Sequence, residues 1–316
     1  MEGHIPSRGN IGQDVLARLA IGAVLACALE QAATGQSIEP HAYSPAPVGT
    51  NFIVIAGAHA HGPLETDPAL PLSRIDLKAK GVLMGYSRVF GVLGKSAKFD
   101  VVVPYGTLTG KATFLGTPAE RRVTGFSDPA ARVTVLFHGA PAMTTPEFMR
   151  YRQDFLVGAS VQLSIPVGNY DRAKLLNLGS HRSSIKPEFG ISKRWGHWTL
   201  ETATGVTFFG DNNAFLGDHR RAEKPIYSAQ AHLIYELSAG AWLAANLSYF
   251  TGGETSIDGI NKGALAHNWR AGLIAAVPLW PRISVKVNGS KGVSQRTGEK
   301  FSLYGAALQY RWGMKL

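Results

Sequence analysis

Apolar and polar side chains alternate with a period of two along most of the chain after residue 50. In the segment 155–167 the apolar residues fall on one parity and the small or polar residues on the other, and 198–208 and 227–237 repeat this division. Successive side chains of a β-strand point to opposite faces, so the pattern predicts strands with one apolar and one polar face. Helical periodicity is nearly absent.

The alternating segments are long. Twelve of them cover 51–62, 74–90, 96–110, 123–139, 153–168, 184–195, 197–210, 225–238, 240–251, 264–279, 282–293 and 300–313. A strand of a soluble protein has about 5 to 6 residues, whereas about 9 to 11 tilted residues cross a bilayer. The segment lengths therefore favour transmembrane strands.

Connections of two kinds separate the segments. Short turn signals stand at Gly94-Lys95, Gly196 and Pro278-Leu279-Trp280-Pro281. Longer polar connections run over 144–154, 169–183, 210–224 and 252–263, and we expect them at the opposite end from the short turns. Short turns on one side and long loops on the other are typical of outer-membrane barrels.

The physics of the bilayer explains why such strands would close into a ring. Every backbone N–H and C=O group in hydrocarbon must be paired, and a sheet achieves this only by closing. The predicted fold class is all-β, a closed antiparallel transmembrane β-barrel of about 12 strands. A soluble β-sandwich is the alternative, but segment length and aromatic residues near the strand ends favour the bilayer. Those aromatic residues are Tyr105, Trp195, Trp198, Phe208, Tyr249, Trp269, Trp280, Tyr310 and Trp312.

The C-terminal segment adds a second sign of an outer-membrane barrel. Tyr304, Leu308, Tyr310 and Trp312 share one parity, and the chain stops at Leu316. This resembles the terminal recognition strand of outer-membrane barrels, although those most often end in Phe. We expect the barrel-assembly machinery to bind this strand.

The first 35 residues read as a secretory signal peptide. Arg8 and Arg18 precede an apolar run over 19–29, and the small triplet 33–35 follows it. The predicted organisation is a signal peptide over 1–35, an extended proline-rich arm over 36–50 and the barrel over 51–316. A short buried helix is the alternative for the first segment, and lipidation of Cys27 is a further possibility that we weigh below simple cleavage.

Composition narrows the class of protein. The 316 residues are 45% hydrophobic and 17% charged, a balance that excludes disorder for most of the chain. The formal net charge is +10, but the basic residues are scattered through alternating strands rather than gathered in an arginine-rich run. Nucleic acid is therefore not expected as a partner. A single cysteine excludes a disulfide within the chain.

If the apolar parity faces lipid, the polar parity lines the lumen. A charge that faced lipid at the midplane would cost about 2 to 4 kcal/mol, so its confinement to one parity is meaningful. The lumen-lining candidates are Asp100, Arg132, Gln162, Lys186, Glu188, Arg194, Glu201, His232, Glu236, Arg270, Lys286 and Arg311. Basic residues exceed acidic ones in this set, which favours anionic solutes. The alternative is a plugged interior in which these groups pair with one another.

Motifs for catalysis or for a bound cofactor are sparse. His59 and His61 share one face of the first strand, but no third ligand lies nearby in the sequence, so no metal is predicted. We find no nucleophile elbow and no glycine-rich phosphate loop, so neither a catalytic residue nor a cofactor is predicted.

Several segments resemble one outer-membrane family. The run 42–52 (AYSPAPVGTNF), with GYSRVF at 85–90, PYG at 104–106 and GFSDP at 125–129, is similar to the family linked to meta-pathway phenol degradation. The resemblance spans 36–316 and departs from the family pattern at 59–62. It implies a barrel in the outer membrane of a Gram-negative bacterium that transports aromatic or other hydrophobic compounds. From residue type alone, GFSDP reads as a turn.

Three classes of function follow from these patterns. The first is a channel or transporter for small hydrophobic or aromatic compounds. The others are a lipid-modifying barrel enzyme, and a structural or adhesion barrel with a plugged lumen. We expect the first, with outer-membrane lipid and a small solute as partners and with no enzymatic activity.

Overall fold

The computed structural model describes residues 40–65, 72–114, 117–174, 176–237, 240–261, 265–294, 298–299 and 302–313. The predicted signal peptide, its cleavage site and Cys27 lie outside the described residues. No helix in the described part of the chain is long and apolar enough to span a membrane.

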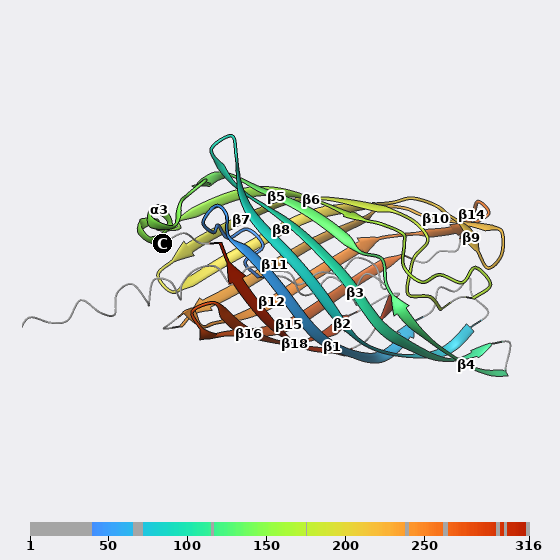
Figure 1. Ribbon diagram of the computed structural model, residues 1–316. Coiled ribbons are helices and arrows are strands. Elements are labelled where there is room, and N and C mark those ends of the chain that lie inside the picture. Colours follow the sequence, from blue (N-terminus) through green and yellow to red (C-terminus); the bar gives the residue numbers. More distant parts are fainter. Residues whose placement is uncertain are drawn as a thin grey trace, which may run out of the picture.

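The strands form a closed antiparallel barrel of 12 strands, as the alternation predicts (Figure 1). The ring closes where β1 pairs with both β2 and β18. The wall is built from β1 (Asn51–Glu65), β2 (Leu72–Val92), β3 (Lys95–Phe114), β4 (Thr117–Phe126), β5 (Ala130–Pro141), β6 (Phe155–Ser164), β7 (Ser184–Trp195), β8 (Trp198–Phe209), β11 (Ile226–Glu236), β12 (Trp242–Gly252), β15 (Ala266–Trp280), β16 (Ile283–Ser294) and β18 (Ser302–Trp312), with the short β17 (Gly298–Glu299) beside β1.

One position of the ring is shared by two strands. Both β4 and β5 pair with β3, β4 with its second half and β5 with its first half. The sequence predicts a turn at GFSDP, 125–129, and this is wrong, because β4 and β5 both pair antiparallel with β3 and the chain does not reverse between them. Instead, the Asp128 carboxylate accepts hydrogen bonds from the backbone N–H groups of Gly168 and Ser180, at 2.8 and 2.7 Å. The chain is therefore interrupted there and continues in the same direction.

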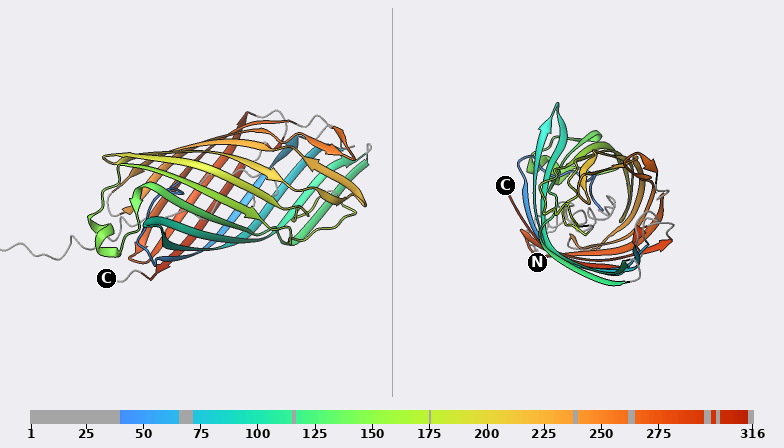
Figure 2. Two further views of the ribbon diagram at one scale, coloured as in Figure 1. Left: turned by 90° about the horizontal axis from the view of Figure 1, so that it is seen from above. Right: turned by 90° about the vertical axis from the view of Figure 1, so that its right-hand side faces the viewer.

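The two ends of the barrel differ, as Figure 2 shows from two sides. One end has the turns after β2, β7 and β15 together with the helix α3 (Thr145–Arg150). The other end has the long connections and a small second sheet of β9 (Asn212–Phe215), β10 (His219–Glu223), β13 (Thr255–Ile257) and β14 (Ile260–Asn261). We call these the short-turn end and the loop end. By the usual rule for outer-membrane barrels they are periplasmic and extracellular.

The connection 144–154 was expected among the long loops, and that placement is wrong. It joins β5 to β6, and Lys95 and Pro141 are register partners at the same end as the turn after β2. The Ala142 N–H donates to the Gly94 carbonyl at 2.9 Å. Because every neighbour pairs antiparallel, the strand order alone puts this connection at the short-turn end.

Exposure follows parity around the ring. On β6, Val161 and Leu163 are exposed, whereas Ser160 is buried. On β8, Leu200 is exposed and Glu201 is 1% exposed. The predicted aromatic residues near strand ends are likewise exposed on the outer wall, among them Tyr105, Trp195, Trp198, Phe208, Trp269, Trp280 and Tyr310. The outside of the barrel is therefore apolar with aromatic residues toward its ends, as a membrane barrel requires.

A charge on the outer face should disturb assembly far more than one on the inner face. Leu163→Arg places a cation against lipid at a cost of about 2 to 4 kcal/mol near the midplane. Ser164→Arg, its neighbour on the opposite face, places the cation in the lumen. We expect Leu163→Arg to reduce the heat-modifiable folded band on gels strongly and Ser164→Arg to leave most of it. Equal losses would contradict the assignment of faces.

Candidate functional site

The N-terminal arm lies inside the barrel at the short-turn end. Within residues 40–50, Ala42, Tyr43 and Ala46 are at most 5% exposed, although they belong to no strand. The Gly49 N–H donates to the Val89 carbonyl at 2.9 Å and the Val48 N–H to the Met143 carbonyl at 2.8 Å, so the arm is anchored before it enters β1. The arm thus narrows the lumen from that end.

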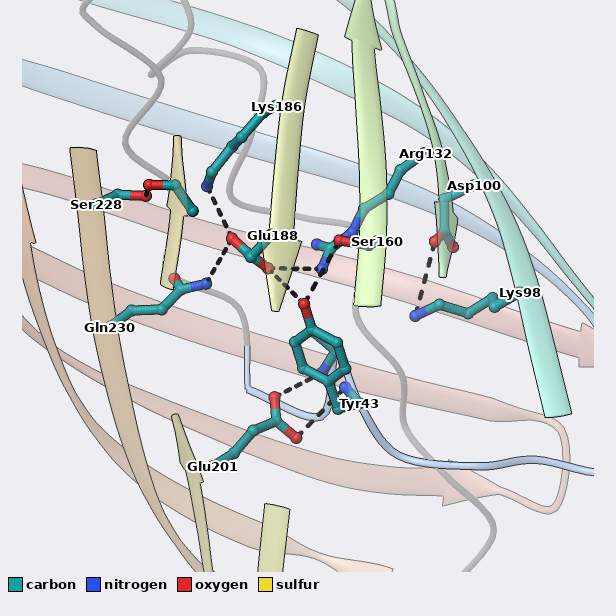
Figure 3. A network of polar contacts seen from close by, with 12 residues as sticks. Tyr43, Lys98, Asp100, Arg132, Ser160, Lys186, Glu188, Glu201, Ser228 and Gln230 are labelled. Atoms are coloured by element: carbon teal, nitrogen blue, oxygen red, sulfur yellow. Dashed lines mark hydrogen bonds and ion pairs between the residues drawn. The ribbon is translucent and has the colours of Figure 1, made fainter. Parts of the chain in front are cut away.

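Two buried carboxylates hold the arm in place, as Figure 3 shows. The backbone N–H groups of Ala42 and Tyr43 donate to the Glu201 carboxylate at 3.0 and 3.4 Å. The Tyr43 hydroxyl donates to Glu188 Oε1 at 2.9 Å. These three hydrogen bonds attach the arm to β7 and β8.

A pair of glycines makes room for the Tyr43 ring. Gly158 on β6 and Gly190 on β7 are register partners. A Cβ atom on Gly158 would come within 2.8 Å of Tyr43 Cδ1, and one on Gly190 within 2.2 Å of Tyr43 Cε2. The wall therefore has a slot that only glycine at these positions leaves open for the ring.

Glu188 is the centre of a buried charge cluster. Arg132 Nη2 and Lys186 Nζ both lie 2.9 Å from its carboxylate, and Gln230 Nε2 donates to it at 3.2 Å. The Arg132 guanidinium also lies 5.7 Å from the centre of the Tyr43 ring. Two cations, one from β5 and one from β7, thus share one carboxylate directly beside the arm.

The other lumen-lining candidates have separate surroundings. Asp100 accepts a hydrogen bond from Ser87 and lies 3.7 Å from Lys98, and His232 Nδ1 lies 2.7 Å from Asn246 Oδ1. Glu236 lies 3.8 Å from His41, and Lys286 lies 5.7 Å from the centre of the Trp242 ring. Arg270 is 2% exposed, and Gln162 lines the cavity described below. Arg194 and Arg311 donate to the carbonyls of Gly196 and Pro281 at the short-turn end. The structure therefore brings Arg132, Lys186 and Glu188 together but not the whole set. The sequence reasoning did not single out Tyr43, Gln230 or Lys98.

A polar cavity of about 190 Å³ lies on the loop-end side of this cluster. Lys186 and Gln162 line it from the wall, and Tyr170, Phe209 and Phe215 add aromatic surface. We call this cavity the vestibule.

The vestibule contains an uneven set of charges. Arg182 Nη2 lies 2.5 Å from Glu223 and Arg221 Nη2 lies 3.8 Å from the same carboxylate, which is 4% exposed. The Arg182 guanidinium covers the Phe209 ring at 4.4 Å, and its Nη1 has no hydrogen-bond partner in the described part of the chain. The cavity is lined by Arg182, Lys186 and Arg221 against Asp128 and Glu223, and Arg182 Nη1 is a donor that an anion could use.

The connection around α3 borders the entry of the arm. At the start of the helix the Glu147 carboxylate accepts hydrogen bonds from both the backbone N–H and the hydroxyl of Thr144, which lowers the pKa of that carboxyl. The Tyr151 hydroxyl donates to the Gly139 carbonyl at 2.8 Å, and burial beside Asp154 raises its pKa to about 12. This connection therefore has its own hydrogen bonds and gives the arm a fixed partner in Met143.

The two histidines considered for metal binding lie elsewhere. His59 and His61 are exposed on the outer wall, with ring centres 5.5 Å apart in a stacked arrangement. The described residues contain no group of three or more histidine, cysteine or acidic side chains that could hold a metal ion.

Comparisons with known proteins agree with this geometry. The family described as "Putative MetA-pathway of phenol degradation" matches residues 66–311. No curated protein matches the chain. The chain is similar to the COG4313 outer membrane channel from Pseudomonas putida F1, with a TM-score of 0.74, 20% identity and coverage of 86% of this chain and 99% of that one. It also resembles the transport unit of the autotransporter AIDA-I from Escherichia coli, with a TM-score of 0.51, 8% identity and coverage of 95% and 96%.

These similarities agree with the apolar outer wall. At such low identity the solved structures show the fold alone, and that fold is an outer-membrane barrel. Together with the family match, the closed barrel places the chain in the outer membrane of a Gram-negative bacterium, where its outer wall faces lipid.

Proposed function

This chain belongs to the family described as "Putative MetA-pathway of phenol degradation", and from that premise we propose that it is a narrow channel for small hydrophobic or aromatic compounds. The lumen-lining candidates form the path, and the arm narrows it at the short-turn end. The proposal assigns no catalytic step to any residue. Passage needs no energy source, because a diffusion channel requires only a lined lumen with weak binding sites.

The vestibule is the observation that carries this proposal. A dry cavity of about 150 Å³ is enough to hold benzene. The vestibule measures about 190 Å³ and combines aromatic surface with polar groups, which suits a single-ring solute. The likeness to a protein named as an outer membrane channel supports the same reading.

The charges of the vestibule favour anionic aromatic solutes over cationic ones. Arg182 and Arg221 share Glu223, and Lys186 lies at the inner edge of the same cavity. A carboxylate entering from the loop end would meet donors before it meets the buried cluster at Glu188. Bidentate binding of carboxylate by arginine is strong and directional.

Two partners complete the proposal. We expect the barrel-assembly machinery to recognise the C-terminal strand, of which β18 (Ser302–Trp312) is the described part. The solute is expected to be a small aromatic or other hydrophobic compound, with aromatic carboxylates as the favoured subset.

Single-channel recording in planar bilayers tests the function. We expect small KCl conductance steps that benzoate, added on the loop-end side, reduces in a saturable way and that phenol reduces less. Arg182→Gln should weaken the benzoate effect roughly tenfold, since a hydrogen bond to a charged group contributes about 1.5 to 3 kcal/mol. Lys193→Gln, at an exposed pair with Asp154 near the short-turn end, is the matched control and should change nothing. A parent protein without any conductance would refute the channel.

A further inference from the structure

Basic side chains gather on the outer wall at one place near the loop end. His59 and His61 on β1, Lys78 and Lys80 on β2, and Arg122 on β4 are all exposed. We call these five residues the outer-wall basic patch. Their side chains point away from the lumen, so the channel path does not use them.

The register shows that the patch is continuous. His59 pairs with Lys80, and His61 pairs with Lys78. Lys78 pairs in turn with Thr109 of β3, and Thr109 pairs with Arg122. The patch therefore extends across four neighbouring strands, which lie side by side in Figure 1.

The patch begins where the apolar outer wall ends. Toward the short-turn end, the same face of β1 and β2 presents Ile53, Ile55, Val82 and Met84, which are between 44% and 53% exposed. β2 has 21 residues and β3 has 20, about twice what a strand needs to cross a bilayer. The basic residues thus lie at the outer boundary of the membrane, where long side chains reach the headgroups.

The cations of the patch have no acidic partners among the described residues. Lys111, farther along β3, forms an ion pair with Glu120 at 3.5 Å, but no ion pair involves Lys78, Lys80 or Arg122. The acidic side chains on the same outer face, Asp76 and Glu120, lie farther toward the loop end, and Glu120 is paired with Lys111. Like charges on neighbouring strands repel each other, so an external anion would stabilise Lys78, Lys80 and Arg122.

The opposite wall has a different composition. On β11, β12 and β15, the outer face toward the loop end presents Tyr227, Tyr249 and Trp269. Those aromatic residues are the usual interfacial girdle. The outer face therefore has basic residues on β1, β2 and β4 where β11, β12 and β15 have aromatic ones. Lys291 on β16 is also exposed on the outer wall, and its register partner Ser302 pairs with His61.

We propose that the outer-wall basic patch binds the phosphate groups of a phosphorylated glycolipid in the outer leaflet, of the lipid A type. Lys78, Lys80 and Arg122 would bind the phosphates, while the apolar face below them accommodates the acyl chains. His61 stacks on Tyr304 with ring centres 6.4 Å apart, which offers an aromatic surface beside the sugar. This site is independent of whether the lumen conducts.

Native mass spectrometry of the whole mature protein in detergent tests the proposal. The probe is diphosphoryl lipid A, compared with monophosphoryl lipid A and phosphatidylglycerol. Each basic residue near an anionic surface contributes roughly a fivefold gain in binding, so the combined variant Lys78→Gln, Lys80→Gln, Arg122→Gln should bind about a hundredfold more weakly. Binding of the parent should also fall with added salt.

A matched control comes from the same strand. Arg88 lies exposed on the same face of β2 toward the short-turn end, and Arg88→Gln should leave lipid A binding unchanged. The comparison of lipids on the parent protein needs no variant, so a folding defect does not remove the test. Equal binding by the triple variant, or equal binding of phosphatidylglycerol and diphosphoryl lipid A by the parent, would overturn the proposal.

Discussion

Deleting residues 40–47 should raise the single-channel conductance severalfold. These residues are mostly buried in the lumen at the short-turn end, and no part of the barrel wall depends on them for pairing. Their removal leaves Glu188 and Glu201 facing water that fills the space, so the lost hydrogen bonds to Tyr43 and Ala42 are replaced by hydration. Planar-bilayer recordings of the parent and the deletion variant give the measurement.

The barrel itself should survive this deletion. Closure depends on the eleven register pairs from Asn51 to His61 that join β1 to β18, and the anchoring bonds at Val48 and Gly49 remain. We therefore expect the heat-modifiable band to be unchanged. Loss of the folded band would show instead that the arm is needed for folding.

Two point variants test whether the arm restricts conductance by occupying the lumen. Gly190→Leu fills the slot that receives the Tyr43 ring and should displace the arm, so its conductance should approach that of the deletion. Tyr43→Phe keeps the ring and loses only the hydroxyl bond to Glu188, so it should change conductance little. If all three variants conduct like the parent, the arm does not restrict the path.

The barrel could be predicted from sequence because burial in a membrane barrel has a simple period. Leu163 and Ser164 face opposite sides for the same reason that every other residue does, so parity alone separates wall from lumen. The number of strands could be predicted from the same alternation of apolar and polar residues, because each strand that crosses the membrane repeats it. The fold class could therefore be predicted from the sequence without knowing which side chains contact one another.

Parity carries no information on which inward groups meet. Lys186 and Glu188 lie two residues apart on β7, but Arg132 comes from β5, on the other side of β6. Its contact with Glu188 depends on register, which neither spacing nor composition shows. Arg194 shares their parity but binds the Gly196 carbonyl at the short-turn end. The sequence could therefore predict a polar interior but not its charge cluster.

The position of the arm could not be predicted from the sequence for a related reason. Its prolines predict an extended segment, and an extended segment can lie in the lumen or in the periplasm. The sign that was available, although weak, is the paired glycines Gly158 and Gly190 on otherwise regular strands. Glycine in a strand often marks a close approach, here that of Tyr43.

Replacing Glu188 with glutamine should both destabilise the barrel and change its ion selectivity. The carboxylate is 4% exposed and lies 2.9 Å from both Arg132 and Lys186. Glu188→Gln leaves two buried cations without their shared counter-charge. Breaking a buried ion pair by removing one partner costs about 3 to 5 kcal/mol, which should appear as a lower midpoint in urea unfolding from lipid vesicles.

The same variant removes one negative charge from beside the path, so the reversal potential in a KCl gradient should move further toward anions. Glu120→Gln is the control, because its ion pair with Lys111 is exposed on the outer wall at 3.5 Å and exposed pairs contribute about 0 to 1 kcal/mol. The control should leave both the unfolding midpoint and the reversal potential near their parent values. A Glu188→Gln protein with parent stability would mean that the cluster is hydrated and the cations do not need this carboxylate. A lower midpoint with an unchanged reversal potential would place the cluster away from the conducting path.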